Sequence, residues 1–135
     1  MGTFNPMDSA LRDAADDDYC YLTTTGRVSG QPHEIEIWFA VDPANGTTLH
    51  MLAGAGDASD WVRNLMADPA VTVRVRDVTY AARGRVIAEA PADEGEERRA
   101  RDTVFGKYQP RNAGELVTWR ERALPVALDV TSAIA

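Results

Sequence analysis

Hydrophobic and polar residues alternate in several short segments of the chain, which is the pattern of half-buried β-strands. The clearest example runs from Val71 to Arg76, where valines alternate with threonine and arginine. Similar alternation, or a run of β-forming residues, predicts five further strands. These cover residues 18–25, 33–41, 48–53, 79–88 and 124–130.

Helical periodicity appears in four other segments, at 7–16, 58–67, 91–105 and 113–122. The third opens on Pro91 and carries acidic residues before arginines, which complements the helix dipole. Long crossover helices between every pair of strands are missing, so the strands should pair mainly antiparallel. We therefore predict an α+β fold, in which an antiparallel sheet curls into a small barrel with helices outside it.

Composition narrows the range of functions. A chain of 135 residues suits one domain with one core. Its net charge of −7 disfavours nucleic acid as a partner. No apolar run is long enough for a transmembrane segment, and the N-terminus lacks the order of a signal peptide. Cys20 is the only cysteine, which favours core packing and a reducing compartment, so we expect a cytoplasmic protein.

The glycines at positions 26 and 30 bracket a predicted turn that has the features of an anion site. Glycine permits left-handed dihedrals, so successive backbone N–H groups can converge on one anion. Arg27 adds a guanidinium and Ser29 a hydroxyl, and both groups suit phosphate. The alternative is a plain hairpin with an exposed arginine.

Trp38 is out of place on the strand that follows this turn. If the strand is regular, Ile35 and Ile37 face one side, while Trp38 shares the other side with Glu34 and Glu36. A large aromatic residue on that side needs a second apolar layer. A helix, a partner subunit or a flat ligand would each supply it.

The remaining motifs are weak. His33 and Glu34 begin half of a zinc motif, but a strand places them on opposite faces, and His50 is a partner only if the strands align it. We therefore predict no metal site. The glycine loop at 54–59 lacks the third glycine of a dinucleotide fingerprint, and no nucleophile elbow occurs.

Three blocks together resemble the flavin/deazaflavin oxidoreductases with the split β-barrel fold of FMN-binding proteins. They are LTTTGRVSGQP (22–32), WVRNLMADPAVTVRV (61–75) and PVALDV (125–130). Within these oxidoreductases, the blocks look most like the branch of deazaflavin (F420)-dependent nitroreductases and quinone reductases. The resemblance implies a cofactor-binding barrel at 18–135, preceded by an N-terminal helical arm at 1–17.

The resemblance also implies roles for particular residues. Trp38 would line the acceptor pocket, and Tyr108 would lie over it as the candidate catalytic proton donor. The activity implied is hydride transfer from reduced F420 to a small quinone, nitroaromatic or enone. A homodimer is a further expectation. The residues implied to bind the cofactor are Arg27, Ser29, Gly30, Gln31, Trp61 and Asn64.

The chain departs from this family at two positions. Relatives often carry a lysine after the arginine of the turn and another in the glycine loop, where this chain has Val28 and Ala55. Both changes remove a cation that would hold the coenzyme's polyglutamate tail. An FMN-dependent oxidoreductase on the same fold is therefore one alternative, and a non-catalytic protein that binds a cofactor or lipid is another.

Overall fold

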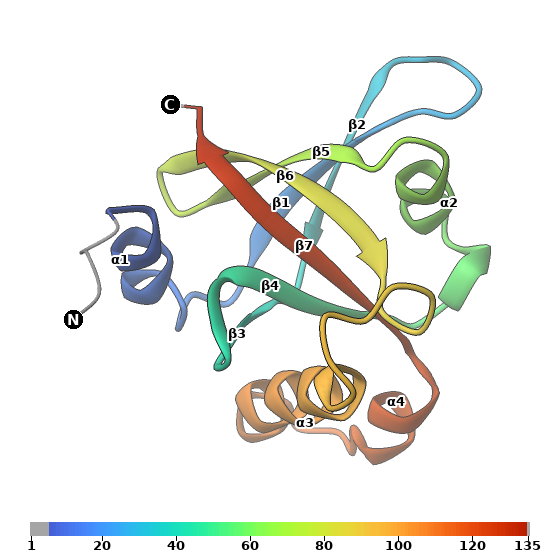
Figure 1. Ribbon diagram of the computed structural model, residues 1–135. Coiled ribbons are helices and arrows are strands. Elements are labelled where there is room, and N and C mark those ends of the chain that lie inside the picture. The colour runs from blue at the N-terminus through green and yellow to red at the C-terminus, as the bar shows by residue number, and fades with distance from the viewer. Residues whose placement is uncertain (1–5, 135) are drawn as a thin grey trace.

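Seven strands form one antiparallel sheet in the computed structural model, which describes residues 6–134 (Figure 1). The strands are β1 (Cys20–Thr25), β2 (Pro32–Ile37), β3 (Ala40–Asp42), β4 (Asn45–Ala53), β5 (Ala70–Val75), β6 (Val78–Val86) and β7 (Leu124–Ala133). The helices are α1 (Pro6–Asp13), α2 (Asp60–Ala67), α3 (Glu96–Tyr108) and α4 (Val117–Arg122), with short 3₁₀ turns η1 (Gly56–Ala58) and η2 (Gln109–Arg111).

The sheet is curled into a barrel, as its connections require. The strand order is β2-β1-β5-β6-β7-β4-β3, so β2 and β3 form the two edges. Only Trp38 and Phe39 join these edge strands, which brings the edges together. The prediction of an α+β antiparallel barrel is confirmed. The prediction of one strand over 33–41 is wrong, because the chain changes its pairing partner from β1 to β4 at this junction.

The barrel interior is filled by alternate strand residues, as the sequence pattern predicts. Leu22, Val73 and Leu128 are fully buried there, and Leu11 of α1 joins the same cluster. Phe39 also lies in it, with Ile35 and Ile37 packed against it, so the predicted apolar face of the second strand is confirmed. Cys20 is buried in this core too, and burial raises the pKa of its thiol to about 12. The thiol is therefore a packing group.

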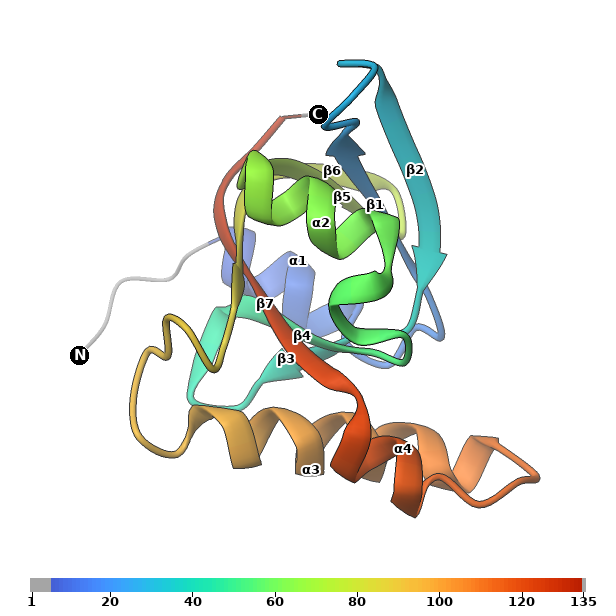
Figure 2. The same cartoon turned by 90° about the vertical axis from the view of Figure 1, so that its right-hand side faces the viewer.

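Helices α3 and α4 lie side by side below the barrel, and α2 lies over its other end (Figure 2). Helix α3 begins at Glu96, five residues later than predicted, and ends at Tyr108. The delay has a local cause: the loop before α3 folds around the Glu96 carboxylate, which accepts a 2.7 Å hydrogen bond from the Ala92 amide. No helix of residues 6–134 is long and apolar enough to cross a membrane.

Candidate functional site

The turn between β1 and β2 is closed by its two glycines. The Gly26 amide donates to the Gln31 carbonyl and the Gly30 amide to the Gly26 carbonyl, both at 2.8 Å. Gly30 has φ +72°, a left-handed conformation that favours glycine. A Cβ at position 26 would lie 2.6 Å from Ser29 Oγ. Any side chain at Gly26 therefore displaces the serine hydroxyl, which accepts a hydrogen bond from the Gln31 amide.

Arg27 fastens this turn to helix α2. Its backbone amide and its Nη1 both donate to Asn64 Oδ1, at 3.1 and 2.8 Å. The Asn64 amide group in turn donates to Thr24 Oγ1 at 3.2 Å, inside the protein. Arg27 Nη2 also forms a 3.1 Å ion pair with Asp60, at the start of the same helix. Two sequence blocks that are 37 positions apart thus form one unit.

A pocket of about 300 Å³ opens where the turn meets α2. The Arg27 side chain is 30% exposed there. Within residues 6–134, the amides of Val28 and Ser29 have no hydrogen-bond acceptor. A partly exposed guanidinium beside N–H groups that lack an acceptor suits an anion. The lining residues are Gly26, Arg27, Val28, Ser29, His33, Asp60 and Asn64.

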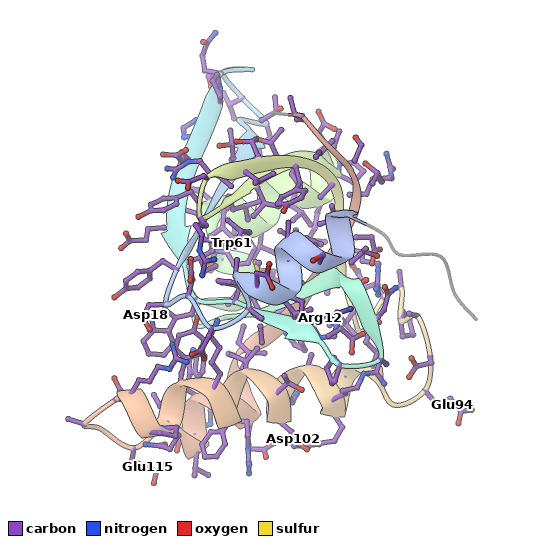
Figure 3. All side chains as sticks on the ribbon, turned by 90° about the vertical axis from the view of Figure 1, so that its left-hand side faces the viewer. Arg12, Asp18, Trp61, Glu94, Asp102 and Glu115 are labelled. Atoms are coloured by element: carbon purple, nitrogen blue, oxygen red, sulfur yellow. The ribbon has the colours of Figure 1, made fainter. Side chains whose placement is uncertain are left out.

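The sequence-predicted cofactor residues are only partly gathered at this pocket. Arg27, Ser29 and Asn64 line it. Gly30 shapes the turn, and Gln31 is exposed beyond it. Trp61 lies on α2 but is half-buried against the barrel core (Figure 3).

Trp38 packs against the helices, which supply the second apolar layer that its position requires. Its ring stacks in parallel on Tyr108 at 4.3 Å and meets the edge of Trp119 at 5.6 Å. The Tyr108 hydroxyl is enclosed: it donates to the Asp18 carbonyl at 2.7 Å and accepts from the Phe39 amide at 3.0 Å. Burial raises the pKa of Tyr108. The enclosed hydroxyl disfavours Tyr108 as a proton donor. The catalytic role of Tyr108 therefore stays a prediction.

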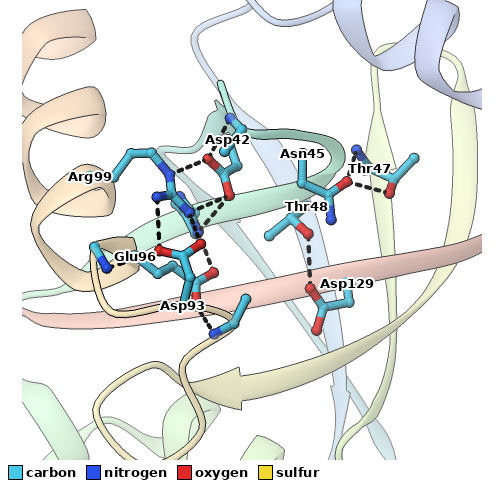
Figure 4. Close-up of polar contacts among 12 residues, drawn as sticks. Asp42, Asn45, Thr47, Thr48, Asp93, Glu96, Arg99 and Asp129 are labelled. Carbon is cyan, nitrogen blue, oxygen red and sulfur yellow. Dashed lines mark hydrogen bonds and ion pairs between the residues drawn. The ribbon is translucent and has the colours of Figure 1, made fainter.

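A buried cluster of charged residues lies between β4 and α3, and sequence reasoning did not find it (Figure 4). His50 Nε2 lies 2.9 Å from Glu96 Oε2 and 3.8 Å from Asp42 Oδ2, and all three residues are buried. An imidazole nitrogen this close to a carboxylate oxygen must carry the proton. One feature of the sequence could have indicated it. His50 lies between Leu49 and Met51, which face the barrel core, so its side chain points to the other face of β4.

Two arginines satisfy the carboxylates of this cluster. Arg85 donates to both oxygens of Glu96, at 2.6 and 2.8 Å, and Arg99 Nε donates to Asp42 at 2.7 Å. A metal ion would have to displace these guanidinium groups. The cluster therefore fits a docking role, since it joins α3 to strands β3, β4 and β6. His33 lies elsewhere, at the turn pocket, so the two histidines do not meet.

Comparison with solved structures agrees with this architecture. An F420-H2 dependent reductase is 24% identical, with a TM-score of 0.60 over 85% of this chain and 95% of that one. An F420 reductase is 20% identical, with a TM-score of 0.63 over 98% of both chains. A conserved hypothetical protein from Mycobacterium tuberculosis is 17% identical, with a TM-score of 0.71 over 97% of this chain and 83% of that one.

The sequence also matches a model of a defined enzyme family. The match, to the F420H(2)-dependent quinone reductases, extends over residues 11–130 and so includes both the turn and α2. It favours F420 over the FMN alternative. The chain therefore belongs to the F420H(2)-dependent quinone reductase family and is an F420H2-dependent reductase whose coenzyme is F420.

Proposed function

We propose that the protein transfers hydride from reduced F420 to a small unsaturated acceptor, namely a quinone, a nitroaromatic or an activated enone. We further propose that the pocket at the β1–β2 turn holds the anionic arm of the coenzyme. The observation that carries this proposal is the pair of hydrogen bonds from Arg27 to Asn64, because it holds the guanidinium in place among the lining residues of the pocket.

The residues of this pocket fit an anionic group. Arg27 offers a guanidinium that is partly exposed, and the amides of Val28 and Ser29 have no acceptor within residues 6–134. The Ser29 hydroxyl adds one more polar group to the lining. Asp60 opposes the fit, since its carboxylate already pairs with Arg27, but it is 85% exposed and can turn away into water.

Few positively charged side chains are available to bind the coenzyme's anionic arm. Val28 is 93% exposed and carries no charge, and Ala55 in the glycine loop is also exposed and uncharged. Arg27 is therefore the one cation that lines this pocket in the described part of the chain. We expect removal of its charge to weaken coenzyme binding strongly.

The protein's own contribution to the reaction is binding and orientation. When bound, reduced F420 supplies the hydride. Asn64 fixes the orientation of Arg27, and its burial keeps this arrangement rigid. Trp61, on the same helix, is the proposed neighbour of the deazaflavin ring, with Asn64 beside it. Gly30 and Gln31 complete the turn, and Trp38 is the proposed wall of the acceptor site.

The test is an oxidation assay with reduced F420 and three acceptors: menadione, a nitrofuran and cyclohexenone. We expect the protein to accelerate oxidation of reduced F420 with at least one of them and not to use reduced FMN in the same assay. Arg27→Gln should require more F420H2 for the same rate. Binding of F420 without turnover of any acceptor would instead support the non-catalytic alternative.

A further inference from the structure

A second hollow, of about 530 Å³, lies between α1, β3 and the C-terminal end of α3. Figure 3 shows this side of the molecule, with Arg12 on α1 above α3. The hollow shares no lining residue with the pocket at the β1–β2 turn. Its volume lies in the range of small-molecule sites, roughly 300–1,000 Å³.

Positive charge collects in this hollow although the chain as a whole carries a net charge of −7. Three cations line it: Arg12, Lys107 and Arg111. Arg111 forms ion pairs with Asp16, which also lines the hollow, at 2.5 Å and with Asp18 at 2.6 Å, and these two carboxylates more than offset its charge. Arg12 and Lys107 form no ion pair with another side chain of residues 9–134, so within this part of the chain their charges are available to a ligand.

Lys107 is the only lysine in the chain, and its amine faces an unusual environment. Nζ donates to the Phe39 carbonyl at 2.8 Å and lies 3.8 Å from the centre of the Phe39 ring. Within residues 9–134, no carboxylate forms an ion pair with it. An ammonium group has three donors, and within residues 9–134 only one of them has a hydrogen-bond acceptor. Burial, and then the charge of Arg111, lowers the pKa of Lys107 to about 8, which still leaves it mostly protonated at neutral pH.

The walls around these charges are mostly apolar. Thr103 supplies a hydroxyl, and the other uncharged lining residues are Ala15, Ala40, Val41, Gly106 and Pro110. A cationic end beside apolar walls matches a ligand with an anionic head and an apolar body. A strongly hydrated anion such as sulfate would leave the apolar walls uncovered.

We propose that this hollow binds a small monocarboxylate with an apolar body, whose carboxylate is held by Lys107 and Arg12. The site is independent of the F420 pocket. It is nevertheless connected to the stacked rings of Trp38 and Tyr108. Lys107 and the Tyr108 hydroxyl both lie within hydrogen-bonding distance of the Phe39 carbonyl.

Calorimetric titration of the full chain with benzoate and with benzyl alcohol tests the proposal. The two probes have similar shape and differ in charge. We expect one benzoate per chain and about tenfold weaker binding of benzyl alcohol, since the alcohol forms no charge-assisted hydrogen bond. Lys107→Met should weaken benzoate binding by about tenfold. Arg83→Gln, which removes one exposed charge on β6 outside the hollow, should leave it unchanged.

A second measurement uses the wild-type protein and so does not depend on the folding of a variant. Trinitrobenzenesulfonate reacts with amines, and Lys107 is the only side-chain amine. Benzoate should slow its reaction at Lys107, followed by mass spectrometry of the peptide, while benzyl alcohol should not. Equal binding of both probes, no binding of either, or unchanged labelling in benzoate would overturn the proposal.

Discussion

Asn64 on helix α2 accepts two hydrogen bonds from Arg27 with a single oxygen, one from the backbone amide and one from Nη1. The same side chain donates to Thr24 on β1. It is 3% exposed, so water cannot replace these partners at low cost. One amide therefore sets the position of the turn, of the guanidinium and of α2 together.

Replacement of Asn64 by alanine should lower F420 affinity about tenfold or more, because the guanidinium is no longer oriented toward the pocket. It should also lower the free energy of unfolding by about 1–3 kcal/mol, since the Arg27 amide and the Thr24 hydroxyl lose their partner. Tryptophan fluorescence during F420 titration measures the first effect, and urea unfolding measures the second.

The matched control for Asn64 is Met66→Ala, on the same helix but 49% exposed. It should change neither quantity by much. If Asn64→Ala kept wild-type affinity for F420, the anionic arm would have to bind away from the turn.

Replacement of Asp60 by asparagine should strengthen F420 binding, whereas Arg27→Gln should weaken it. The Asp60 carboxylate forms a 3.1 Å ion pair with the Arg27 guanidinium. In the proposed binding mode it therefore competes with the coenzyme's anionic arm for Arg27. It is 85% exposed, so the ion pair adds little to stability and its loss should leave the unfolding curve nearly unchanged. Comparison of F420 dissociation constants at low and high salt checks this, because screening should narrow the difference between the variants. Weaker F420 binding by Asp60→Asn would mean that Asp60 supports the site.

The main features of the fold and of the turn could be predicted from the sequence, because they follow from local patterns. Alternating residues specify the strands, and the glycines at 26 and 30 specify the turn. The break at Trp38 could not be predicted, since the alternation of faces continues through Phe39 while the hydrogen-bonding partner changes. The choice of pairing partner depends on how the whole sheet curls, and it does not change the periodicity of hydrophobic residues in the sequence.

The buried charge cluster could not be predicted for a related reason. Glu96 stands among acids and arginines that are typical of the solvated start of a helix. His50 is its partner 46 positions earlier, and Arg85 reaches it from β6. Only the docking of α3 onto the sheet brings these residues together.

Replacement of Gly84 by alanine should lower the free energy of unfolding by about 1–3 kcal/mol. A Cβ at this position on β6 would lie 2.2 Å from the side chain of Leu65, a residue of α2 that is buried against the barrel core. The helix must then move away from the sheet, so F420 affinity should fall as well.

Gly106→Ala is the opposite case, because a Cβ at position 106, inside α3, would have nothing within 4 Å of it. That variant should gain about 0.5–1 kcal/mol. Thermal unfolding of the two variants measures both effects, and a stable Gly84→Ala protein would show that Leu65 has room to move.

Glu96 should make the protein sensitive to acid. Burial alone would raise the pKa of this carboxyl, but hydrogen bonds from Arg85, the Ala92 amide and His50 outweigh burial and lower the pKa from 4.5 to about 2. Because the pKa of Glu96 is lower in the folded than in the unfolded chain, the ionised carboxylate stabilises the fold at pH values above 4.5. This stabilisation is lost as the pH falls from 4.5 toward 2. The contribution is about 3 kcal/mol at neutral pH.

Urea unfolding from about pH 7 to about pH 3 tests this prediction. The free energy of unfolding should start lower in Glu96→Gln than in the wild type and should decline less steeply as the pH falls. Glu94→Gln removes an exposed carboxylate two residues earlier and serves as the control for net charge. Parallel declines in Glu96→Gln and the wild type would place the acid-sensitive group elsewhere in the protein.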